Sequence, residues 1–410
     1  MRHKADDASQ ASEIMPSGKG LASRRMMLAL TGSALVTLPL GTSQVQPRAA
    51  MEAPSLPIPA PRPPEFHIGL TQARAAAEWA HFKDRFIRTS GQVTDNGNGG
   101  ISHSEGQALG MLFAAYFDEP DVFAQILRWT RSALGRPEDH LLAWCHRPGQ
   151  PSHPGDRNNA TDGDLLAAWA LAEAADRWGK PLDRGLSIAM ARDILDKTVI
   201  DGGDGPLLLP GTIGFLQPGS ITVNPSYYVY PAFHAIARLL PNQVWGALDQ
   251  GGLRLARAAR FGRWGLVPDW ASVPRGGGRV SIAQNRPTRF SYDAVRVPLY
   301  LAWGGHGAEA VVGDAARFWH DPSLPWMPAW ADLRTDQISP YAADPGIAAV
   351  AQVSAVGSQP GFMPREISTP VLCSTYYAAA LRLMAVLSVR AIPSHPPRAS
   401  VQVIASGYAR

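Results

Sequence analysis

Apolar side chains recur every three or four residues along most of the chain between residues 66 and 390. This spacing gathers them on one face of a helix, so it predicts helices rather than strands. Ten segments show it clearly and 340–353 shows it weakly; the ten are 71–89, 104–117, 121–134, 162–178, 186–199, 226–240, 243–259, 292–303, 309–319 and 375–388. The chain shows neither βαβ spacing nor a helical repeat of about 33 or 34 residues. An all-α protein follows, and both a closed ring of helical hairpins and an irregular bundle fit it.

The composition supports a large folded core. Of 410 residues, 45% are apolar, and 12 Trp, 12 Phe and 10 Tyr are too many for a disordered chain. Two cysteines exclude a disulfide scaffold. Cys145 and Cys373 could pair only if the fold brought them together, and we expect two buried thiols instead.

The net charge of +4 arises mainly at the N-terminus. Residues 1–50 contain six Lys or Arg and three Asp or Glu, which leaves 32 basic and 31 acidic residues in the rest. A nucleic-acid-binding protein needs a basic stripe, and this balance provides none.

The N-terminus resembles an export signal. Arg24 and Arg25 follow Ser23 and precede an apolar stretch over 26–40. A membrane span needs about 20 residues, so this stretch is too short and fits a twin-arginine signal instead. We expect cleavage near residue 50, a periplasmic or secreted protein, and no stable membrane span after cleavage. The alternative is a marginal membrane anchor.

Composition also divides the chain. Residues 1–50 form the signal, and 51–65 form a linker, since six of the twelve residues over 53–64 are proline. No further break occurs within 66–390, which predicts one catalytic domain. Residues 391–410 are expected to form a loose tail.

Three motifs carry carboxyl groups. Glu105 lies in Ser-His-Ser-Glu-Gly-Gln at the start of an apolar helix, where it is either a capping residue or a general acid. In Ala-Thr-Asp-Gly-Asp, Thr161 and Asp164 form a capping-box pattern, and the helix end would keep Asp162 ionised. The third motif, Tyr-Asp-Ala-Val-Arg over 292–296, is either a surface ion pair or part of a buried site.

Aromatic residues accompany these motifs. Trp144 follows Leu-Leu-Ala, and Tyr227 and Tyr228 follow Asn-Pro-Ser. Such side chains either belong to the core or stack on the apolar faces of sugar rings.

Taken in order, these motifs resemble glycoside hydrolase family 8, which contains endoglucanases, xylanases, chitosanases and lichenases. The matching pieces are Ser-Glu-Gly-Gln over 104–107, Leu-x-Trp over 142–144, Ala-Thr-Asp-Gly-Asp over 160–164, Asn-Pro-Ser-Tyr over 224–227 and Tyr-Asp-Ala-x-Arg-x-Pro over 292–298. The resemblance implies an (α/α)6 barrel with a substrate groove at one end and an inverting mechanism.

The resemblance also implies roles for particular residues. Glu105 corresponds to the general acid, Asp293 to the general base and Asp162 to the carboxylate that holds the distorted sugar. A charged Asp162 near Glu105 would raise the pKa of the acid. The residues expected to bind substrate are Trp144, Tyr227, Tyr292 and Arg296.

The resulting hypothesis is an endo-β-1,4-glucanase acting on cellulose or a related β-glucan. The chain is most similar to endoglucanases encoded beside bacterial cellulose synthases, which extends the expectation to trimming of nascent chains and to a cellulose synthase complex as a partner. No cofactor or metal is expected, since the histidines show no metal-binding spacing. The alternatives are the same chemistry on xylan, chitosan or mixed-linkage glucan, a non-catalytic glucan-binding component of a secretion complex, and a polysaccharide lyase.

Overall fold

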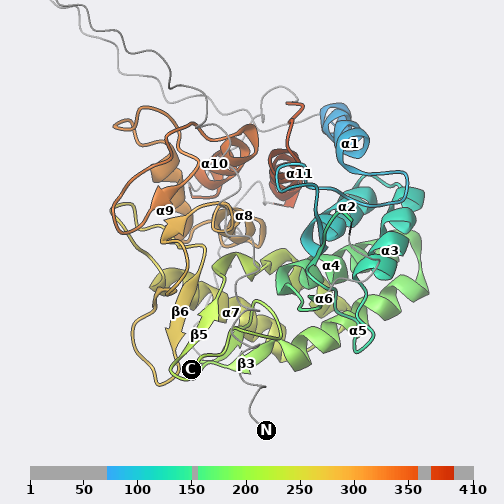
Figure 1. The fold of residues 1–410 in the computed structure, drawn as a ribbon, viewed down its shortest axis with the longest axis horizontal. Coiled ribbons are helices and arrows are strands. Elements are labelled where there is room, and N and C mark those ends of the chain that lie inside the picture. The colour runs from blue at the N-terminus through green and yellow to red at the C-terminus, as the bar shows by residue number, and fades with distance from the viewer. Residues whose placement is uncertain (1–71, 150–155, 359–370, 392–410) are drawn as a thin grey trace, which may run out of the picture.

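The computed structural model describes residues 72–149, 156–358 and 371–391 (Figure 1). The predicted signal, the linker and nearly all of the predicted tail lie outside these residues. The helices are α1 (Gln72–Phe86), α2 (Ser104–Tyr116), α3 (Pro120–Leu134), α4 (Thr161–Trp178), α5 (Pro181–Lys197), the 3-10 helix η1 (Pro225–Tyr227), α6 (Tyr230–Leu239), α7 (Gln243–Ala258), α8 (Arg296–Trp303), α9 (Ala310–Trp319), α10 (Pro345–Gly357) and α11 (Tyr376–Ala391).

Short antiparallel strands join the helices. They are β1 (Ser102–His103), β2 (Cys145–His146), β3 (Val199–Asp201), β4 (Pro206–Leu208), β5 (Ser220–Val223), β6 (Ala271–Pro274), β7 (Ser281–Ile282), β8 (Arg289–Phe290) and β9 (Ala331–Asp332). The pairs are β1–β2, β3–β4 and β8–β9, and β5–β6–β7 form a three-stranded sheet. Residues Ser220 and Val223 of β5 face Pro274 and Ala271 of β6.

The helices form a ring of hairpins. The mostly buried helices α2, α4, α6, α8 and α11 contact one another in that order, while α3, α5, α7 and α9 pack against them from outside. Aromatic side chains connect α2 with α11 through α1. Phe82 of α1 packs edge-on against Phe113 of α2, and lies 5.8 Å from Tyr376 of α11 between ring centroids.

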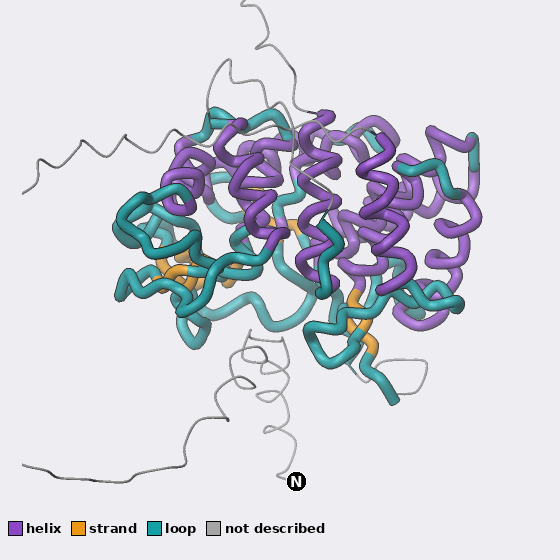
Figure 2. Tube along the Cα trace, turned by 90° about the horizontal axis from the view of Figure 1, so that it is seen from above, coloured by secondary structure: helices purple, strands orange, loops and turns teal. Residues whose placement is uncertain are grey.

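Strands and loops gather at one end of this ring. Figure 2 shows the helices as one layer, with the strands and several long loops on one side of it. β1 leads directly into α2, and the loop after β8 leads into α8. The N-terminal ends of these inner helices therefore face the loop-bearing end.

Several helix boundaries differ from the sequence predictions. Helix α5 begins at Pro181, five residues before the predicted start at 186, because proline fits the first helical turn. The predicted helix 226–240 is interrupted, since η1 ends at Tyr227 and α6 begins at Tyr230. Helix α8 begins at Arg296 and not at 292.

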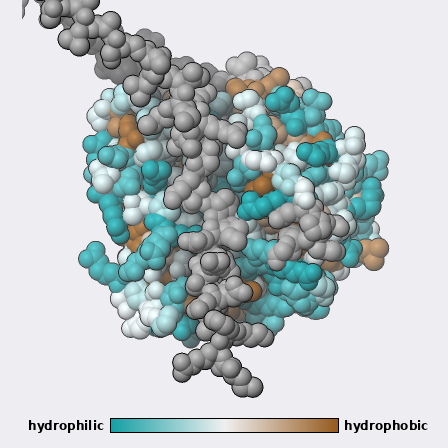
Figure 3. Space-filling model, in the orientation of Figure 1, coloured by the Kyte–Doolittle hydropathy of each residue, from teal (hydrophilic) through white to brown (hydrophobic). Residues whose placement is uncertain are grey.

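The core follows the helical pattern, and both Cys145 and Cys373 are buried free thiols, as predicted. On the face seen in Figure 3 the described surface is mainly hydrophilic, with small separate apolar patches. Within the described ranges, no helix is both long and apolar enough to cross a membrane.

Candidate active site

Three carboxyl groups converge on the guanidinium of Arg296, the first residue of α8. Its Nη1 lies 3.2 Å from Glu105 Oε1, and its Nη2 lies 3.2 Å from Asp293 Oδ1 and 3.6 Å from Asp162 Oδ2. Nη2 also donates to Ser226 Oγ at 3.3 Å. The side chains of Arg296 and Asp162 are 6% and 4% exposed, whereas those of Glu105 and Asp293 are 19% and 33% exposed. The structure therefore brings together four of the charged residues that the three motifs supplied, and Asp164 is not among them.

Glu105 lies in the first turn of α2 but does not cap it. The cap is His103, whose Nδ1 accepts the Gly106 N–H at 3.0 Å. Gln107 does not cap the helix either, because its side chain binds the Val93 N–H, the Gly91 carbonyl and Thr130. The capping interpretation of this motif was therefore wrong, and the carboxylate of Glu105 is left to face Arg296.

The start of α4 also departs from the capping box. Thr161 Oγ1 donates to the Leu209 carbonyl at 2.7 Å. Asp164 accepts from the Leu142 N–H and from Asn159 Nδ2, each at 2.8 Å, so it fixes the loop before β2. Asp162, at the second position of the helix, accepts its neighbour's N–H and extends toward Arg296.

Gly163 allows the two helix ends to meet. A Cβ at this position would lie 2.2 Å from Ser104 Oγ and 2.8 Å from the Glu105 nitrogen. Only a residue without a side chain permits this approach. The backbone contact therefore fixes Glu105 and Asp162 side by side.

A fourth carboxyl group, that of Asp269, fixes the turn that bears Asp293. Asp269 accepts the Ser291 N–H at 2.9 Å, the Ala294 N–H at 2.8 Å and the Ser291 hydroxyl. These bonds hold the turn on both sides of Asp293, and they explain why helix α8 starts only at Arg296. Sequence reasoning missed Asp269, although a single acid between apolar residues and Trp270 is a sign of a buried partner.

One buried cation among three carboxyl groups leaves an excess of negative charge, and this excess adds to the effect of burial on Asp162 and Asp293. Burial raises the pKa of Asp162 to about 8, with the charge of Glu105 adding to the shift and Arg296 opposing it. Burial and Glu105 also raise the pKa of Asp293. The expectation that the helix end keeps Asp162 ionised is therefore wrong, because burial outweighs the dipole. Burial alone would lower the pKa of Arg296, but the carboxylates of Glu105 and Asp293 hold it well above its usual value.

Burial likewise raises the pKa of Asp269 to about 7, with the charge of Asp293 adding to the shift.

The predicted substrate-binding aromatics make different contacts. Tyr227 is buried, and its pKa is raised by burial and by the charges of Asp162 and Asp293, so it borders the carboxylates. Trp144 is buried too; its backbone carbonyl accepts the Ser104 N–H, and its Nε1 donates to Asp156. The hydroxyl of Tyr292 lies 3.0 Å from that of Tyr341.

Further aromatic residues adjoin Tyr227, and the sequence had not singled them out. The ring of Trp270 lies 6.2 Å from Tyr227 and 6.0 Å from Phe215, which stacks in parallel with it. The guanidinium of Arg286 lies over the Trp270 ring, 4.5 Å from its centroid. Flat apolar surfaces beside acidic groups suit a sugar chain.

A helical ring with carboxyl groups and aromatic side chains at one end is typical of glycoside hydrolases. The sequence model described as "Glycosyl hydrolases family 8" matches residues 67–390, and the chain belongs to this family. It is 42% identical over 310 residues to a probable endoglucanase of Novacetimonas hansenii, covering 75% of this chain and 89% of the relative. It is 33% identical to an endoglucanase of Cellulomonas uda, covering 68% and 77% of the two chains.

A solved structure agrees with these relatives. The endo-beta-1,4-glucanase CMCax from Acetobacter xylinum superposes with a TM-score of 0.72 at 40% identity, covering 78% of this chain and 98% of that one. The predicted family, the (α/α)6 barrel and the glycoside hydrolase class are thus confirmed.

Proposed function

We propose that the protein is an inverting endo-β-1,4-glucanase that hydrolyses internal bonds of cellulose or a related β-glucan. The observation that carries the proposal is the convergence of Glu105, Asp162 and Asp293 on Arg296 at the loop-bearing end of the barrel. The relatives named endoglucanases, at 42% and 33% identity, bear out the predicted activity.

In this proposal Glu105 is the general acid and Asp293 is the general base. Each contacts a different nitrogen of the Arg296 guanidinium at 3.2 Å. Their carboxyl oxygens therefore lie at most roughly 9 Å apart, which allows the separation of about 6.5–9.5 Å that leaves room for a water in inverting enzymes. The base would remove a proton from that water as the acid protonates the leaving oxygen.

Asp162 would serve as proton partner of the acid and as a contact for the distorted sugar. Its raised pKa means that it holds a proton near neutral pH, beside Glu105 on the same guanidinium. Glu105 is the more exposed of the two, so it is the group that reaches the leaving oxygen. Arg296 compensates the remaining negative charge and orients all three carboxyl groups. Tyr227 and Trp144 would contact sugars of the bound chain, and Tyr292, which precedes the base, would bind the same sugar as Asp162 or orient Asp293.

The proposal is tested by hydrolysis of soluble carboxymethylcellulose. The wild-type protein should lower the viscosity rapidly and release products with inverted anomeric configuration. Glu105→Gln removes the proton donor and should lower kcat by about 10²–10⁴-fold. The matched control is Glu138→Gln, at an exposed glutamate paired with Arg136, which should retain full activity.

Other results would overturn the proposal in distinct ways. Retained configuration would contradict the inverting mechanism. Activity only on xylan, chitosan or mixed-linkage glucan would keep the mechanism but change the substrate. Binding without hydrolysis would favour the glucan-binding alternative, and unsaturated products would favour a lyase.

Export belongs to the same proposal, supported by Arg24, Arg25 and the short apolar stretch after them, and a role beside a cellulose synthase complex is its further part. Replacing both arginines by lysine should leave the protein in the cytoplasm, as cell fractionation would show. Co-purification of the protein with the cellulose synthase from a cellulose-producing cell would test the partnership.

A further inference from the structure

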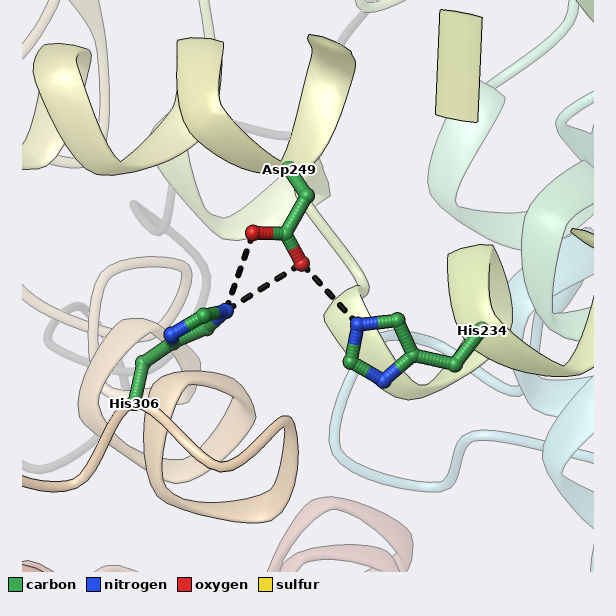
Figure 4. Close-up of side chains that lie close together, drawn as sticks. All are labelled: His234, Asp249 and His306. Carbon is green, nitrogen blue, oxygen red and sulfur yellow. Dashed lines mark hydrogen bonds and ion pairs between the residues drawn. The ribbon is translucent and has the colours of Figure 1, made fainter. Parts of the chain in front are cut away.

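A second charged cluster lies on another part of the barrel. His234 of α6, Asp249 of α7 and His306 in the connection between α8 and α9 point toward one another (Figure 4). His234 Nε2 lies 3.0 Å from Asp249 Oδ2, and His306 Nε2 lies 3.0 Å from Oδ1 and 3.1 Å from Oδ2. The three residues are separated by 15 and 57 positions in the sequence, so no spacing motif announces them.

Their geometry matches the donor set of a transition-metal site. Both imidazoles present the same atom, Nε2, to one carboxylate, and the donor atoms of all three residues lie within 4.8 Å of one another. With metal–ligand distances near 2.1 Å, two ligands of a tetrahedral site lie on the order of 3.3 Å apart. The observed separations of 3.0 and 3.1 Å are therefore close to those of ligands around one ion.

The surroundings leave access for an ion. The side chain of His234 is 52% exposed and that of His306 is 22% exposed, whereas that of Asp249 is only 9% exposed. Within the described residues, the ion-pair partners of Asp249 are the two histidines alone. The cluster is thus closed on the protein side and open toward water on the histidine side.

The backbone holds His306 firmly in place. The His306 N–H binds the Leu301 carbonyl at 2.8 Å and the Gly305 N–H binds the Ala302 carbonyl at 3.2 Å. With Gly305 at φ +87°, this is a Schellman motif ending α8. A Cβ on Gly304 would lie 2.4 Å from Tyr230 Cβ, so glycine is needed there too. The imidazole of His306 packs edge-on against Tyr230 at 5.2 Å.

This cluster is separate from the carboxylates around Arg296. Arg296 opens α8, and His306 follows its last residue, Trp303. A helix of eight residues is about 12 Å long. The cluster therefore lies at the other end of the helix, away from the reacting groups.

We propose that His234, Asp249 and His306 form a binding site for a late first-row divalent cation of the zinc class, with water completing the coordination. Two neutral imidazoles and one carboxylate suit zinc, nickel or copper better than magnesium or calcium, which prefer oxygen ligands. The ion would join α6, α7 and the α8–α9 connection, so its role is to brace the barrel at the end remote from the carboxylates.

The test uses the untagged full chain, stripped with a chelator that is then removed. Zinc titration by calorimetry should show one site per chain. At a zinc concentration 100 times Kd, the ratio of folded to unfolded protein should rise about 100-fold, seen as a higher Tm. Cobalt in place of zinc should give visible d–d absorption.

Two variants localise the site. His234→Gln and His306→Gln keep an N–H donor toward Asp249 but lose the imidazole ligand. Each should weaken zinc binding by more than about 100-fold, beyond the effect of losing an outer-shell partner, and abolish the cobalt absorption. The matched control is His140→Gln, at an exposed histidine paired with Asp193, which should bind zinc as the wild type does.

Two outcomes would overturn the proposal. Absence of saturable zinc binding by the wild type would mean that the cluster is a network of hydrogen bonds only. Unchanged binding in both variants would place the ion elsewhere, for example at His3, His67 or His395.

Discussion

The two charged clusters at the ends of α8 have opposite compositions. Around Arg296, one cation meets three carboxyl groups; around Asp249, one carboxylate meets two imidazoles. In the first cluster the side chains of Arg296 and Asp162 are almost fully buried. In the second cluster the side chain of His234 is half exposed.

The difference appears in where protons reside. In the first cluster negative charge is in excess and burial raises the pKa of Asp162 to about 8. In the second, burial alone would raise the pKa of Asp249, but hydrogen bonds from His234 and His306 lower it to about 2. The neighbours of a carboxyl group in this protein thus decide whether it is protonated or ionised near neutral pH.

The largest expected effect comes from removing the central cation. Arg296→Gln leaves three neighbouring carboxyl groups without compensation, so activity should vanish and the free energy of unfolding at pH 7 should fall by about 3 kcal/mol. At pH 5, where protons replace the cation, the loss should be smaller. Urea unfolding at both pH values measures it. The control is Arg257→Gln, at a single exposed ion pair with Glu309, which should change the free energy of unfolding little. An equal loss in the control would contradict the proposal that Arg296 compensates the charge of the three carboxyl groups.

A smaller effect is expected from the residue behind the proposed base. Asp269→Asn disturbs the turn over 291–294, and should reduce kcat by about 10–100-fold with KM nearly unchanged, as expected for a displaced catalytic group. Burial raises the pKa of Asp269 to about 7, so this group is largely neutral on the acidic limb of the pH–rate profile, and its replacement should leave the position of that limb unchanged.

The control for this positioning role is Asp332→Asn. Asp332 also accepts several hydrogen bonds, from Thr288, Arg334 and Thr335, but in a different loop. If Asp332→Asn lowers kcat as much as Asp269→Asn does, Asp269 has only a structural role.

The pH dependence of stability gives a finer comparison. The pKa of Asp162 in the folded state, about 8, lies above its ordinary value of 3.8, so the folded protein binds more protons between these values. Its contribution to stability is therefore full below about pH 4 and is lost as the pH rises toward 8. Asp162→Asn should flatten this decline, measured as the urea midpoint at each pH. Asp176→Asn, at an exposed carboxylate, should keep the wild-type slope.

The smallest effect is expected at the second cluster without metal. His234 is half exposed, so in the presence of a chelator His234→Gln should cost less than about 1 kcal/mol of unfolding free energy. Thermal unfolding measures it. A loss as large as that of Arg296→Gln would mean that the two clusters do not differ as described.

The helices could be predicted from the sequence because a helix buried on one face carries apolar residues at every third or fourth position. Where the prediction failed, a contact from elsewhere in the chain decided the outcome. Helix α8 starts at Arg296 because Asp269, more than twenty residues upstream, holds the turn before it. Strands of two to four residues are too short to show a period.

The site was predictable only in part, for the same reason. Motif resemblance supplied Glu105, Asp162 and Asp293, and the structure places all three on Arg296. The capping boxes failed because His103, a residue outside the usual capping set, took the position at α2. The histidine cluster could not be predicted, since its members meet only through the packing of α6, α7 and α8.

The contact at Gly163 sets a limit on how this enzyme could be redesigned. Changing an inverting glycosidase into a retaining one requires the two carboxyl groups to approach to about 5 Å. The helix bearing Glu105 cannot move toward α4, because Ser104 and Gly163 already touch without room for one added carbon. Variation in the turn bearing Asp293 leaves this tight contact intact, so directed evolution of the stereochemical outcome should concentrate there and leave the α2–α4 junction untouched.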